Sequence, residues 1–171
     1  MEKERTLASE VASAAYDISD KPFDFVESDT LTALICESDP SLRETISNAM
    51  KTLGYRLTEA TSAKEALKNM RYHVYNVAIV NENFDASDME SNTVLDYLVN
   101  LNMSTRRNIF VALVSSQLRT ADNMAALYKS VNLIINKANI DDLGHIMKLG
   151  VAEDDTFYHI FKDTLRKRGR L

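Results

Sequence analysis

The sequence of 171 residues has few residues that cross-link a chain or interrupt its secondary structure, with one cysteine, four glycines and two prolines. A single cysteine, Cys36, excludes an intrachain disulfide and a cysteine metal cluster, and its apolar neighbours predict an inert core thiol. So few glycines and prolines, beside 45% hydrophobic and 26% charged residues, argue against disorder and against a turn-rich all-β fold. We therefore expect one domain with a real core, extended by an extra arm or helix.

The chain also lacks a long hydrophobic span, a signal peptide and an excess of positive charge. Its net charge is -5 and its pI is near 5.2, which does not favour general binding to nucleic acid. The three histidines are scattered along the sequence, so no metal site is expected from them. These absences predict a soluble, cytoplasmic protein that binds neither membranes nor nucleic acid.

What the sequence does have is a short apolar run at its centre, within residues 75–84. Residues 77–80 are apolar, are rich in β-branched side chains and show no helical period, which is typical of a strand buried on both faces. The run stops at a polar cluster, Asn81-Glu82-Asn83. Because ligands of open α/β sheets bind beyond the carboxyl ends of the strands, Asn81 occupies a candidate functional position.

The rest of the chain alternates between apolar runs and amphipathic stretches. Strands are predicted at 31–36, 55–60, 77–80, 108–114 and 131–135, and helices at about 42–53, 62–70, 93–101, 120–130 and 140–149. Five repeats of strand and helix predict an α/β fold with a doubly wound, five-stranded parallel sheet and helices on both faces.

Two segments flank this unit. Residues 1–30 form an N-terminal arm with a short amphipathic helix, for which two interpretations stay open: packing on the domain, or docking to a partner or a second copy. Residues 151–171 predict an additional C-terminal helix that begins with acidic residues and ends with basic ones. The unit of alternating strands and helices is thus expected at 31–150, and two extra apolar stripes make a homodimer plausible.

The residues at the strand ends resemble the receiver domain of bacterial two-component response regulators over about 31–149. Residues 34–43 are similar to the family's first-strand acidic motif, and Asn81 falls at the position of the phosphoacceptor aspartate. Ser115 matches the hydroxyl residue that ends the fourth strand, and Lys137 matches the lysine that ends the fifth. The resemblance implies a flavodoxin-like sheet of order 2-1-3-4-5 and a role in phosphorelay signal transduction.

The sequence departs from this family where the resemblance implies phosphorylation chemistry. The acidic pocket is degenerate, with Glu37 kept and Ser38 at the second acidic position, while the acceptor is the amide of Asn81. A neutral amide neither forms an acyl phosphate nor binds magnesium well, so no cofactor is expected. Asp39 is interpreted as a helix cap. The switch-equivalent position on the fifth strand is aliphatic, Ile134, and cannot swing a polar tip as a tyrosine does.

The sequence therefore favours a pseudo-receiver: a non-enzymatic module that acts through protein–protein interaction and is not switched by aspartyl phosphorylation. We expect Lys137 to pair with Glu37, and Ser115 to bond Asn81 or a water, in a pocket that has kept one acid. Two alternatives stay open. The first is a phosphorelay regulator that uses Asp85 or Asp39 as acceptor, and the second is a receiver-like domain that senses a small ligand.

Overall fold

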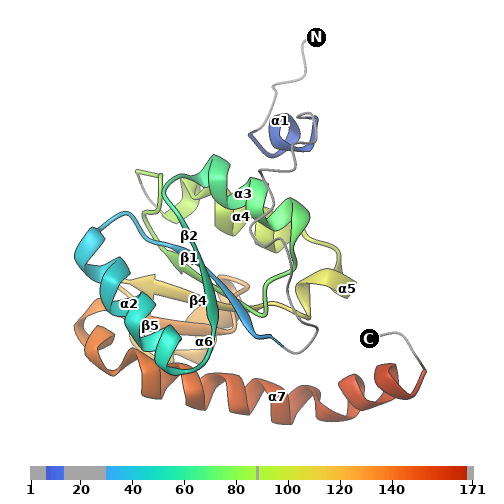
Figure 1. The fold of residues 1–171 in the computed structure, drawn as a ribbon. Helices are drawn as coiled ribbons and strands as arrows, with labels where there is room; N and C mark the ends of the chain where they lie inside the picture. The colour runs from blue at the N-terminus through green and yellow to red at the C-terminus, as the bar shows by residue number, and fades with distance from the viewer. Residues whose placement is uncertain (1–6, 14–29, 88, 169–171) are drawn as a thin grey trace.

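The computed structural model describes residues 7–13, 30–87 and 89–168 of the chain, and it has the α/β architecture that the sequence predicts. Five parallel strands form one sheet of order β2-β1-β3-β4-β5, so the predicted fold class is confirmed (Figure 1). The strands are β1 (Thr32–Cys36), β2 (Arg56–Ala60), β3 (Val77–Asn81), β4 (Phe110–Ser115) and β5 (Leu133–Asn136).

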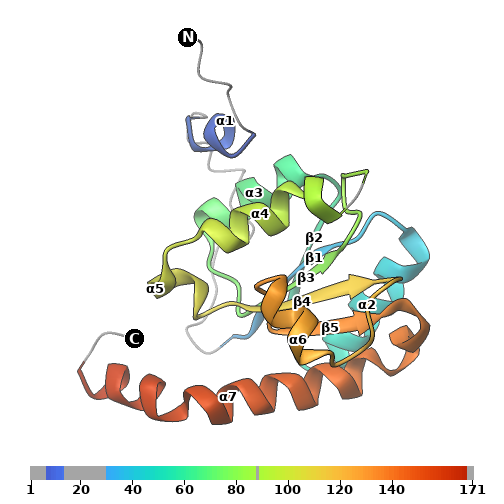
Figure 2. The same cartoon turned by 180° about the vertical axis from the view of Figure 1, so that it is seen from behind.

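Helices connect successive strands and cover both faces of the sheet, as Figures 1 and 2 show from opposite sides. The α-helices are α1 (Leu7–Ser13), α2 (Pro40–Thr52), α3 (Ala63–Tyr72), α4 (Thr93–Asn100), α5 (Met103–Arg106), α6 (Asn123–Tyr128) and α7 (Leu143–Lys167). Short 3-10 turns, η2 (Met89–Ser91) and η3 (Lys137–Asp142), precede α4 and α7. Among the described residues, no helix is both long and apolar enough to cross a membrane.

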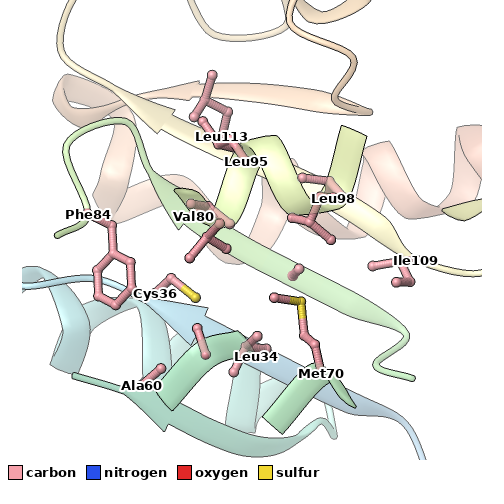
Figure 3. Close-up of a cluster of buried hydrophobic side chains, with 14 of the residues drawn as sticks. Leu34, Cys36, Ala60, Met70, Val80, Phe84, Leu95, Leu98, Ile109 and Leu113 are labelled. Carbon is pink, nitrogen blue, oxygen red and sulfur yellow. The ribbon is translucent and has the colours of Figure 1, made fainter. Parts of the chain in front are cut away.

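The core consists of two apolar layers, one on each face of the sheet, because side chains alternate along every strand. Leu34, Val80 and Leu113 point towards α3 and α4, in the layer that Figure 3 shows. The neighbouring residues of the same strands point to the other face, where they pack against α2 and α7. Burial on both faces is what a central parallel strand requires, and β1, β3 and β4 are buried throughout.

The C-terminal part of the chain differs from the sequence prediction. Two helices were predicted, with a break near Gly150, whereas the structure has one continuous helix of 25 residues, α7. The glycine does not end the helix but lets it approach the sheet. A Cβ on Gly150 would lie 3.0 Å from Leu133 Cδ2 and 3.2 Å from Phe110 Cζ. With no proline to interrupt it, the helix runs on past the sheet (Figure 2).

The described part of the N-terminal arm packs on the domain. Helix α1 lies against α3 and α4, Val11 is buried, and Arg71 Nη1 donates a 2.6 Å hydrogen bond to the Val11 carbonyl. This contact agrees with the interpretation of an arm packed on the domain for Leu7–Ser13. The rest of the predicted arm, residues 1–6 and 14–29, lies outside the part that the structure describes.

Candidate functional site

The predicted site residues meet at the carboxyl edge of the sheet. Asn81 ends β3, Ser115 ends β4, and Lys137 follows β5, while Glu37 follows β1 directly. The strand register brings these ends side by side, with Asn81 opposite Val114. The topology thus assembles the four residues named from the sequence in one place, because the carboxyl ends of parallel strands share one edge.

The amide of Asn81 is bonded on both sides. Its Nδ2 donates to Glu37 Oε2 at 2.6 Å, and its Oδ1 accepts from the backbone N–H of Asn83 at 3.0 Å. The other oxygen of Glu37 accepts from the Asp39 N–H at 2.9 Å. Asn81 and Glu37 are both buried. An amide serves at position 81 because it can donate to a buried carboxylate, which a second carboxylate cannot do.

A carboxylate that the sequence analysis did not use, that of Glu82, lies at the same edge of the sheet, directly after Asn81. Its Oε2 accepts a short hydrogen bond from the Ser115 hydroxyl. Its Oε1 accepts from the Ser116 N–H at 2.7 Å and from the Ser116 hydroxyl at 2.6 Å. With 2% of its surface exposed, Glu82 is a buried anion held by three donors.

The electrostatics of the pocket keep Glu82 charged. Burial acts to raise the pKa of its carboxyl, but the hydrogen bonds from Ser115 and Ser116 and the charge of Lys137 together lower that pKa below its usual value. Lys137 itself is half-buried at the start of η3. The hydroxyl, the lysine and a backbone N–H therefore surround an anion that the chain itself supplies.

Two contacts predicted from the sequence are wrong. Among the ion pairs of the described residues, none joins Lys137 to Glu37, and Lys137 instead acts on Glu82. Ser115 donates to Glu82 and not to Asn81. Of the three acidic positions that the resemblance implies, only Glu37 is an acid, but a second buried carboxylate, Glu82, follows Asn81. The charged residue at the end of a buried strand was the available signal for Glu82.

The hydroxyl of Ser115 uses all of its bonding capacity. Besides donating to Glu82, its oxygen accepts from the N–H groups of Gln117 and Leu118, each at 3.0 Å. The same hydroxyl thus fixes both the buried anion and the turn that leads from β4 towards α6.

Asn92 is a further structural residue of the site that the sequence analysis missed. Its Nδ2 donates to the carbonyls of Asn81 at 2.9 Å and Glu82 at 3.2 Å, and its Oδ1 caps α4 by accepting from Val94 and Leu95. It is 1% exposed. A polar residue before the apolar residues of α4 was a visible capping signal, but its contact with the end of β3 depends on the fold.

The two alternative acceptors, Asp39 and Asp85, are exposed, and each already accepts a hydrogen bond from a backbone N–H at the start of a helix. Asp39 Oδ1 accepts from Ser41 at 2.8 Å and Leu42 at 3.2 Å, so its predicted role as a cap of α2 is confirmed. Asp85 has a positive φ of 50° and accepts from the Ala63 N–H, at the start of α3, at 2.8 Å. Ser38 is exposed beside the pocket.

The remaining predicted positions are apolar and enclosed. Ile134 is fully buried in the layer under α3 and α4, which leaves its side chain no exposed position. Cys36 is fully buried as well, and burial raises the pKa of its thiol far above its usual value, so it stays protonated.

The residues of the pocket do not fit a magnesium ion. The Asn81 oxygen and both Glu37 oxygens accept hydrogen bonds from N–H groups, and an octahedral ion would have to displace those donors. Among the described residues, no cluster of three or more His, Cys, Asp or Glu has a geometry suited to a metal.

Comparison with known proteins identifies the fold. No family model matches the sequence, and no curated protein matches it. Solved structures of receiver domains do match. The Francisella response regulator 1452 receiver domain has 21% identity and a TM-score of 0.56, covering 72% of this chain and 99% of its own. A CheY-like receiver domain from Methanospirillum hungatei has 16% identity and a TM-score of 0.58, covering 75% and 98%. Chemotaxis response regulator CheY4 of Vibrio cholerae has 15% identity and a TM-score of 0.57, and the match covers 71% of this chain and 98% of its own. The chain thus has the receiver fold.

Proposed function

We propose that this chain is a receiver-like signal-transduction module that acts by binding a protein partner and is not switched by aspartyl phosphorylation. The observation that carries the proposal is the Glu82 carboxylate between Ser115, Ser116 and Lys137. In the resembled family, the matching hydroxyl and lysine serve phosphorylation of an aspartate. Here the chain supplies the anion next to them.

The amide of Asn81 supports the same proposal. A phosphoacceptor needs an anionic oxygen that can attack phosphorus, and the Asn81 oxygen is neutral and bonded to the Asn83 N–H. Its nitrogen holds Glu37, so the position works as a bridge between β1 and β3. The proposed output is a constant binding surface, with no catalytic step and no magnesium.

The experiment is a phosphodonor assay on the full chain, with acetyl phosphate and magnesium, read by intact mass and by peptide mapping. We expect no adduct on the wild type. A catalytically competent receiver domain treated in parallel shows that the donor is active. A stoichiometric phosphate adduct would reject the proposal, and mapping it to Asp85 or Asp39 would establish the phosphorelay alternative.

A further inference from the structure

Helix α7 extends beyond the domain it belongs to. Its first half packs on the sheet through Leu143 and Met147, which are buried. Its second half runs on past the sheet, as Figures 1 and 2 both show. An amphipathic helix of this length is stabilised mainly by burying one face, so the far half needs a surface to pack against.

The far half of α7 exposes large apolar side chains beside α5. Phe157 is 79% exposed and Ile160 is 80% exposed, whereas Asp154 and Tyr158, on another face of the helix, are partly covered. Together with Met103 of α5, Phe157 and Ile160 line an apolar groove. Large apolar side chains grouped in this way mark an interaction surface more often than scattered ones do.

The exposed residues of α7 form a row along the helix, with an acidic residue, Glu153, at one end and a basic residue, Lys167, at the other. Glu153, Phe157, Ile160, Thr164 and Lys167 follow one another in alternating steps of four and three residues, the spacing of a coiled-coil seam. Glu153 lies seven residues before Ile160, and Lys167 lies seven residues after it. A second α7, laid antiparallel with the two Ile160 side chains together, would therefore place each Glu153 beside a Lys167.

We propose that the far half of α7 binds a second copy of this chain in an antiparallel, two-fold symmetric helix pair centred on Ile160. A two-fold interface requires a patch that is complementary to itself, and a seam with an acid at one end, apolar residues in the middle and a base at the other meets that requirement. The apolar centre supplies affinity, and the terminal charges select the antiparallel orientation over the parallel one, which would put like charges together.

Cysteine cross-linking tests the orientation, because the one native thiol, Cys36, is fully buried. In the full-length chain, Ile160→Cys should cross-link to itself under mild oxidation. A mixture of Glu153→Cys chains and Lys167→Cys chains should give mixed dimers, and neither variant alone should cross-link efficiently. Wild-type chain is the control. Failure of Ile160→Cys to cross-link, or self-linking of Glu153→Cys in preference to mixed dimers, would overturn the proposal.

Sedimentation of the full chain tests the energetics. We expect a dimer at about 100 µM, and Ile160→Ser should raise its dissociation constant at least about tenfold. Met124→Ser removes a side chain of α6 that is 74% exposed and should leave the constant unchanged. A monomeric wild type, or a dimer that Met124→Ser disrupts and Ile160→Ser does not, would contradict the α7 interface.

Charge reversal gives a third measurement that does not depend on apolar surface. Glu153→Lys and Lys167→Glu should each weaken the dimer, and the double variant should recover it because every opposite pair is restored. Additive weakening in the double variant would rule out the antiparallel register. Pairing through α7 makes no use of the pocket at Asn81, so its failure would leave the proposed function standing, and the phosphodonor assay does not depend on it.

Discussion

Single residues at the carboxyl edge of the sheet hold buried charge that folding must compensate. The Glu82 carboxylate accepts hydrogen bonds from three donors and lies near a lysine. These interactions outweigh the effect of burial and lower its pKa in the folded chain. The folded state thus binds the proton of Glu82 less tightly than the unfolded state does. This residue stabilises the protein above its ordinary pKa near 4.5, and the contribution disappears as the pH falls through the lower folded value.

Glu82→Gln tests this linkage. The amide keeps one acceptor but places an NH₂ group against donors, so unfolding in urea at pH 7 should show a loss of about 1–3 kcal/mol. Stability measured between pH 3 and pH 6 should also depend less on pH than in the wild type. Glu44→Gln, at an exposed position on α2, is the control and should change neither quantity. An unchanged pH profile in Glu82→Gln would show that the folded pKa of Glu82 is not lowered.

Asn81→Asp restores the acidic residue of the resembled family and should destabilise the chain at pH 7. The new carboxylate would face Glu37 across the 2.6 Å contact that the amide now makes, and two like charges at that distance raise the pKa of the pair. We expect a loss of about 1–3 kcal/mol, smaller at pH 5, where the pair can share a proton.

The control for Asn81→Asp is Asn83→Asp, because Asn83 is exposed two residues further on. Urea unfolding of both variants at pH 5 and pH 7 separates a specific clash from a general effect of charge. Equal stability of Asn81→Asp and Asn83→Asp at pH 7 would argue against a charge conflict with Glu37.

At the scale of elements, the alternation of strands and helices was predictable and the course of the last helix was not. Five apolar runs and their helical intervals specify the parallel sheet, because hydrophobic periodicity is a local signal. The residues at the strand ends could be named for the same reason. The partners of Glu82 could not, since a side chain's hydrogen bonds depend on residues 33 and 34 positions away that only the fold brings near.

Gly150 shows why the break in α7 was predicted wrongly. Glycine has a low intrinsic helix propensity, so the sequence predicted that the helix would end there. In the structure, Gly150 is the position at which α7 packs closely against β4 and β5. Gly150→Ala should therefore lower stability by about 1–3 kcal/mol through overpacking against Phe110 and Leu133, despite the better helix propensity of alanine.

Gly144→Ala is the matched control in the same helix. Its Cβ would lie 3.8 Å from Ala49 Cβ, an ordinary contact, so this variant should gain up to about 1 kcal/mol in thermal or urea unfolding. Opposite signs for the two substitutions are the expected result. A stabilising Gly150→Ala would mean that α7 does not approach the sheet as closely as described.

At the scale of the whole molecule, stability is distributed unevenly between the sheet and its attachments. The central strands are buried on both faces, whereas α1 has seven residues and one described buried side chain, Val11. An isolated helix of that length is not stable in water. Hydrogen exchange of the full chain should therefore show fast amides in Leu7–Ser13 and the slowest in β1, β3 and β4. Equal protection of α1 and β3 would indicate that the arm is a full part of the cooperative core.

Because Glu82 is part of the polypeptide, its negative charge lasts as long as the chain itself. A phosphoryl group on a regulator is added and hydrolysed, and the interval between these events sets how long a message lasts. The Glu82 carboxylate belongs to an encoded side chain, so it is present from the synthesis of the chain until its degradation. For a module of the proposed kind, a cell would adjust output by adjusting the number of copies it makes and keeps.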